Sequence, residues 1–174
     1  MTLPELDPLD ARRAVGAAGL LEEFNACGLL VAADVHVARR LTALAEEPDE
    51  AVALAIALAV RAPRHGHVFV DLERIAETAD VDAEDEDVDL SVLPWPEPAD
   101  WIARLAASPL VAVGESGHPN RPLRLVGPAL YLDRYWREER QVAADLLAFG
   151  PATVREDALE AGLARLFEGG QDAS

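Results

Sequence analysis

Two groups of residues in this sequence could ligate a metal ion: a pair of histidines and a run of carboxylates. His65 and His67 stand two residues apart, where a helix is expected to turn into a strand. Protein zinc sites use three or four protein ligands, and no third ligand stands near this pair. Two histidines alone are weak grounds for a zinc site, and we predict none here.

The carboxylates lie between Asp80 and Asp89, where seven of the ten residues are acidic. Alternating carboxylates of this kind also begin an EF-hand calcium loop. The detail differs, because the sixth position is Asp85 rather than the turn-forming glycine, and the twelfth is Ser91 rather than a bidentate glutamate. Mutually repelling carboxylates are typical of a solvated loop. We predict an acidic loop over residues 80–98 and keep calcium binding as an alternative.

Residues for covalent catalysis are poorly arranged. No serine stands in a Gly-x-Ser-x-Gly setting, and the histidines are not placed beside serines in any recognised order. The chain contains no lysine, which excludes a Gly-x-x-x-x-Gly-Lys-Ser/Thr phosphate loop and a Schiff-base lysine. Cys27, the single cysteine, is expected to be a small buried apolar residue. We predict no catalytic residue, no bound cofactor and no metal in this chain.

Charge and hydropathy narrow the class of protein further. The net charge of -17 repels a polyanion, and nucleic-acid affinity depends largely on cationic groups. The longest apolar run, residues 51–60, is about half the length of a bilayer-spanning helix. The first residues lack the pattern of a secretory signal, and one cysteine cannot form an internal disulfide. We therefore expect a cytoplasmic protein with one main domain.

The elements that position these residues are mostly helical. Apolar spacing and breakers predict an α+β fold, mainly α, in which a helical N-terminal part is joined to a small winged-helix-like, three-stranded antiparallel sheet. Helices are expected over residues 7–27, 34–46, 49–60, 72–79, 99–107 and 133–149, and short strands over 67–70, 110–113, 123–126 and 129–132. After the break at Gly150-Pro151, a last amphipathic helix with Leu159, Leu163, Leu166 and Phe167 is expected to end at Gly169-Gly170.

A winged helix offers one nucleic-acid hypothesis. Its second helix often enters the major groove, but here the corresponding helix carries Arg104 against Asp100 and follows the acidic loop. The alternative function is therefore a stand-alone winged-helix nucleic-acid-binding protein that uses Arg121 and Arg124 of the wing. Such binding would weaken steeply with salt. The net negative charge of the chain favours a protein partner over a nucleic acid.

Four short motifs carry a family resemblance that spans about residues 8–149. The motifs are Asp34-Val35-His36-Val37-Ala38-Arg39-Arg40-Leu41, Gly66-His67-Val68-Phe69-Val70-Asp71-Leu72, Trp101 with Ser108-Pro109-Leu110-Val111, and Leu130-Tyr131-Leu132-Asp133-Arg134-Tyr135-Trp136. In this chain order they resemble the N-terminal domain of the RecD family, the alpha subunit of exodeoxyribonuclease V, the RecBCD helicase-nuclease.

The resemblance implies a parent subunit that is an ATP-dependent 5'-to-3' DNA helicase in double-strand break repair and recombination. ATP and Mg would belong to motor domains beyond this region. The domain itself would dock onto the gamma subunit, RecC. We accordingly expect residues 1–149 to form a subunit-docking domain and residues 150–174 a linker helix toward the motor. Interface anchors favour large aromatics, so Trp95 and Trp101 are the predicted partner-binding residues.

Overall fold

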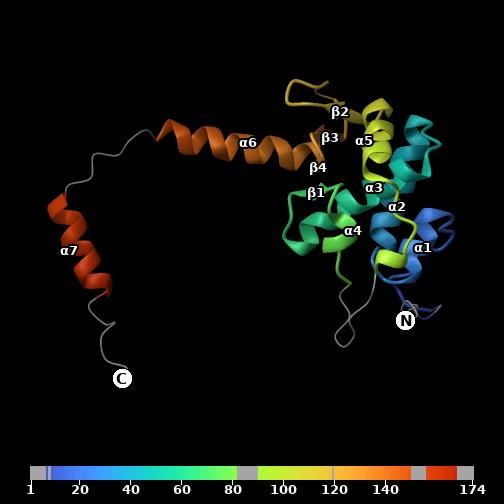
Figure 1. Ribbon diagram of the computed structural model, residues 1–174, viewed down its shortest axis with the longest axis horizontal. Coiled ribbons are helices and arrows are strands. Elements are labelled where there is room, and N and C mark those ends of the chain that lie inside the picture. The colour runs from blue at the N-terminus through green and yellow to red at the C-terminus, as the bar shows by residue number, and fades with distance from the viewer. Residues whose placement is uncertain (1–6, 8, 82–89, 119, 150–155, 168–174) are drawn as a thin grey trace. The chain divides into compact units, whose positions relative to one another are not determined.

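A computed structural model describes residue 7 and residues 9–81, 90–118, 120–149 and 156–167 (Figure 1). The chain divides into two compact units, residues 1–138 and residues 139–174. This division falls within a helix, whereas the sequence placed a boundary after Phe149. The first unit holds the hydrophobic core and the sheet.

The helical part of the first unit is arranged around one central helix (Figure 1). This helix, α3, is buried over nearly its whole length, because ten of its twelve residues are inaccessible and most are alanine, valine, leucine or isoleucine. It packs against α1, α2, α5 and the sheet. The described elements of this part are α1 (Leu20–Ala26), α2 (Ala32–Ala45), α3 (Glu50–Arg61), the 3-10 turns η1 (Ala62–His65) and η2 (Leu90–Val92), α4 (Ile75–Thr78) and α5 (Pro98–Ala107).

Local chemistry sets the ends of α3. The Asp49 carboxylate accepts a hydrogen bond from the backbone N–H of Ala51 at 2.8 Å, which caps the helix N-terminus. After η1, Gly66 adopts a φ of 78°, a left-handed conformation that glycine accepts without the steric cost of a Cβ atom. The chain can therefore leave the helix and enter the first strand.

The sheet has four short strands in the spatial order β1-β4-β3-β2. β4 pairs antiparallel with both β1 and β3, while β2 pairs parallel with β3. The strands are β1 (Phe69–Asp71), β2 (Val111–Val113), β3 (Leu123–Val126) and β4 (Ala129–Leu132). The expected α+β, mainly helical class is confirmed, and so are the expected bounds of β3 and β4.

The expected three-stranded antiparallel sheet is wrong in strand number and direction. β1 joins the sheet beside β4, and β2 runs parallel to β3 instead of forming a hairpin wing with it. The chain must therefore return along the sheet between β2 and β3, and residues 114–118 and 120–122 of this connection are described. The Arg124 side chain stabilises this return, because it donates to the backbone carbonyl oxygens of Gly114 and Glu115.

The first helix is also shorter than the sequence pattern predicted. Residues 10–19 form turns, and α1 begins only at Leu20. Gly16 and Gly19 adopt φ values of 73° and 58°, which are incompatible with a right-handed helix. A Cβ atom at Gly19 would lie 2.4 Å from a carboxylate oxygen of Glu50, but this is the flexible end of an exposed side chain, so the positive φ is the stronger reason for glycine there.

Two further helices follow the sheet. α6 (Asp133–Ala148) starts directly after β4, and α7 (Glu156–Phe167) lies in the second unit. Several apolar side chains of these helices are exposed: Val142, Leu146, Leu147, Leu159 and Leu163. Among the described residues, no helix has the length and apolar character needed to cross a bilayer.

Candidate functional site

The junction between the sheet and α6 is organised by one buried arginine. Arg124 lies in β3 with 2 % of its surface exposed, and its Nε donates to Oδ1 of Asp133 at 2.7 Å. Its guanidinium carbon lies 4.2 Å from the ring centroid of Trp136, a cation–π geometry. A buried charge is costly unless it is paired and hydrogen-bonded, and here both conditions are met.

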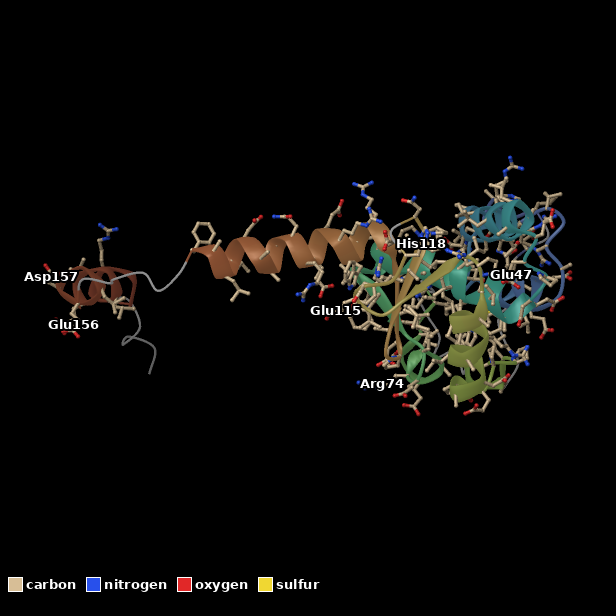
Figure 2. All side chains as sticks on the ribbon, turned by 90° about the horizontal axis from the view of Figure 1, so that it is seen from above. Glu47, Arg74, Glu115, His118, Glu156 and Asp157 are labelled. Carbon is tan, nitrogen blue, oxygen red and sulfur yellow. The ribbon has the colours of Figure 1, made fainter. Side chains whose placement is uncertain are left out.

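The same guanidinium holds the connection between β2 and β3. Nη1 of Arg124 donates to the carbonyl oxygen of Gly114 at 2.7 Å and to that of Glu115 at 3.2 Å. Glu115 and His118, labelled in Figure 2, mark this connection. The remaining oxygen of Asp133, Oδ2, lies 2.5 Å from Nη2 of Arg137 one turn along α6. This set of charges therefore links the sheet, the connection and the helix start.

A second buried carboxylate lies at the start of α2. Asp34 is fully buried, and its two oxygens accept from Nη1 and Nη2 of Arg64 at 2.5 and 2.7 Å. Oδ2 also accepts from the backbone N–H of Val31 at 3.0 Å, which completes a capping interaction at the helix N-terminus. The sequence predicted that this helix starts at residue 34, but its N-cap is Val31. Asp34 lies three residues further in and joins α2 to η1 through Arg64.

The two tryptophans proposed as partner anchors lie in different surroundings. Trp101 has 1 % of its surface exposed, and its Nε1 donates to the carbonyl oxygen of Ala51 at 2.8 Å. A partner-binding anchor needs an exposed ring, and Trp101 does not offer one, because one face of α5 packs against α3. Trp95 is half-buried, packs edge-on against Phe24 at 4.6 Å, and donates to the carbonyl oxygen of Leu90 at 2.8 Å. Only its remaining surface could meet a partner.

The two arginines of the nucleic-acid hypothesis are not brought together on a surface. Arg124 is buried and committed to Asp133, so it cannot reach a phosphate group. Arg121 is half-buried and lines an open groove beside the start of α6. Sequence reasoning missed the role of Arg124. The available signal was an arginine in a strand followed, across a tight turn and one strand, by an acidic first residue of a helix.

The residues considered for metal binding do not converge in the described part of the chain. His65 is half-buried and His67 exposed, and both line a cavity of about 370 Å³ with Asp71 and Arg74. Among the described residues, no group of three or more histidine, cysteine or carboxylate side chains could hold a metal ion. Most of the acidic run, residues 82–89, lies outside the described residues, and so does the calcium hypothesis placed on it.

Cys27 lies in the core beside the end of α1. Its Sγ donates to the carbonyl oxygen of Phe24 at 3.4 Å, and 4 % of the residue is exposed. Burial raises the pKa of the Cys27 thiol, which keeps it protonated and unreactive. The expectation of a buried, apolar-like cysteine is confirmed.

Fold and site together define a mainly helical α+β domain whose buried charged groups connect its own elements. The chain belongs to the family described as RecBCD enzyme subunit RecD, N-terminal domain, which it matches over residues 26–131. The resemblance seen in the four motifs is thereby confirmed. The last motif, residues 130–136, begins at the end of this match and contains the Asp133 and Trp136 that surround Arg124.

Close relatives share much of this sequence. The chain is 52 % identical over 163 residues, 94 % of its length, to the RecBCD enzyme subunit RecD of two Mycobacterium tuberculosis strains. It is 50 % identical over 151 residues, 87 % of its length, to the subunit of the same name from Mycolicibacterium smegmatis. These matches cover 26 % and 24 % of those proteins. The chain thus spans about a quarter of the length of the curated relatives it matches.

Proposed function

We propose that this chain is the module that docks a RecD-type subunit onto its complex, with the gamma subunit RecC as the direct partner. The observation that supports this most strongly is the family match over residues 26–131 together with the relatives' description as RecBCD enzyme subunits. The net charge of -17 and the absence of lysine also favour a protein partner over DNA.

The larger protein would be an ATP-dependent 5'-to-3' DNA helicase of the cytoplasm that acts in double-strand break repair and recombination. ATP and Mg would be held by its motor domains, and this chain would contribute neither catalytic groups nor a cofactor site. The buried ion pairs of this chain support a docking role, because they hold its elements in fixed positions. A domain held in this way loses little conformational entropy when it docks. DNA would reach this chain only through the assembled complex.

Binding of the purified chain to purified RecC of the same organism tests the proposal. Isothermal titration calorimetry should show one saturable site. Fluorescence anisotropy with a tailed DNA duplex at low salt serves as the comparison, and it should show no binding. Failure to bind RecC, either alone or in the RecB–RecC complex, would overturn the docking role. Tight, steeply salt-dependent DNA binding would favour the nucleic-acid alternative instead.

A further inference from the structure

An open groove of about 830 Å³ lies between the C-terminal half of α2 and the start of α6, within the first unit. Its apolar lining residues, here called the floor, include Leu41, Leu44, Leu110 and Pro122. Its charged lining residues, here called the rim, are the arginines Arg121, Arg134 and Arg137 and the carboxylates Asp133 and Glu138. Apolar floor and cationic rim are combined on one surface.

The floor continues along an exposed stripe of α2. Val37, Leu41 and Leu44 recur at the spacing of one helical face, and Val37 and Leu44 are 40 % and 64 % exposed. The opposite face of α2 already fills the core through Val35 and Ala38. An apolar stripe beside a groove, on a helix whose other side is packed, is typical of a surface that binds another chain.

The rim carries a small net positive charge, because three arginines stand with two carboxylates. Asp133 is shared by the buried Arg124 and by Arg137, so its charge is already neutralised within the domain. Glu138 pairs with Arg134 at 2.8 Å, but the two side chains are 53 % and 79 % exposed, and such exposed pairs are weak. A guanidinium has five N–H donors, so each rim arginine can bind a further carboxylate.

We propose that this groove binds an acidic segment of the partner subunit that inserts an aliphatic or aromatic side chain between Leu41, Leu44 and Pro122. This inference rests on the proposed docking function and gives it a surface. The overall charge of -17 repels an acidic segment elsewhere on the chain, so the cationic rim selects this one location. The apolar anchor supplies affinity, and the arginines supply orientation.

Calorimetry with purified RecC tests the groove through paired variants. Leu44→Glu and Arg134→Glu should each weaken binding by at least about 30-fold, the loss expected at an interface hot spot. Leu9→Glu and Arg74→Glu make the same chemical changes at other exposed positions and should change the Kd by less than about threefold. Circular dichroism and thermal unfolding establish that all four variants fold like the parent chain.

The outcomes separate the two proposals. If the parent chain binds RecC and the groove variants bind equally well, the groove is excluded while the docking function stands. If the parent chain fails to bind RecC, the docking function fails. In a separate experiment, a photo-crosslinking residue replaces Leu44 in the full-length subunit within its complex. The crosslink identifies directly the segment that lies against the groove. A crosslink to an acidic segment of a partner subunit supports the groove; a crosslink to a basic segment, to a second copy, or none overturns it.

Discussion

Nε of Arg124 and Oδ1 of Asp133 lie 2.7 Å apart in the interior, where they join a central strand to the first residue of α6. The pair also positions two features of the surface. Through Asp133 it orients Arg137 on the groove rim, and through its carbonyl contacts it holds the connection that ends beside Arg121. The shape of the proposed docking groove therefore depends on a buried ion pair beneath it.

Removing the Asp133 carboxylate should destabilise the domain strongly. Asp133→Ala leaves the buried guanidinium of Arg124 without its counter-charge, and breaking a buried pair in this way costs about 3–5 kcal/mol. Urea denaturation measures the change in the free energy of unfolding. Glu138→Ala, which breaks an exposed pair with Arg134, should cost less than about 1 kcal/mol. Equal effects of the two variants would show that the Arg124–Asp133 pair is not important for stability.

Arg64 should matter more than its partial exposure suggests. Arg64→Ala removes both guanidinium donors from the fully buried Asp34 carboxylate and leaves it the N–H of Val31, so we expect a loss of about 3 kcal/mol. Arg134→Ala removes an arginine of an exposed pair and is the matched control. Thermal unfolding of both variants gives the comparison. A midpoint for Arg64→Ala within about 2 °C of the control would contradict the prediction.

The two tryptophans should differ in their effect on stability. Trp101→Ala creates a cavity against α3 and removes the hydrogen bond to Ala51, which should cost about 3–5 kcal/mol. Trp95→Ala affects a half-buried ring and should cost clearly less. Guanidinium denaturation of the two variants, followed by far-UV circular dichroism, measures both losses. A larger loss for Trp95→Ala would mean that α5 is not held to α3 by Trp101.

Gly117 should not tolerate a side chain. An added Cβ atom would lie 2.7 Å from the carbonyl oxygen of Val113 and 2.9 Å from its nitrogen, so the backbone of the β2–β3 connection must shift. We expect Gly117→Ala to lower stability by about 1–3 kcal/mol. Gly162→Ala in α7 meets open space and should be neutral or raise helicity. Equal unfolding midpoints for Gly117→Ala and the parent chain would contradict this packing.

The Cys27 thiol should make stability depend on pH in the alkaline range. Because burial raises its pKa in the folded state, folding favours the protonated thiol. The stability that the protonated thiol contributes is fully present below the pKa of the unfolded thiol. It is lost as the pH rises through the pKa of the folded-state thiol. Denaturation from pH 7 to pH 10 should show this decline, and Cys27→Ala should reduce it. Rapid modification of the native thiol by Ellman's reagent at pH 8 would show that Cys27 is accessible.

Local pattern was sufficient for much of the fold. Breakers and alternation predicted the bounds of β3 and β4, and the all-apolar run in α3 predicted a central helix, because periodicity and capping depend on neighbours within a few residues. The four motifs also identified the family. The apolar pattern failed to predict the start of α1, because the positive φ values of two glycines end the helical conformation before Leu20.

Tertiary packing alone decided which of the singled-out side chains are accessible. Trp101 is buried where α5 packs on α3 and donates to a backbone carbonyl group fifty residues earlier, and Arg124 is buried beside the carboxylate that follows β4. The parallel pairing of β2 with β3 is a tertiary feature as well, and Arg124 donates hydrogen bonds to the connection between these strands at Gly114 and Glu115. Composition set the acidic charge of the whole chain, but the grouping of Arg121, Arg134 and Arg137 on one groove required the fold, because distances between residues far apart in sequence exist only in the folded chain.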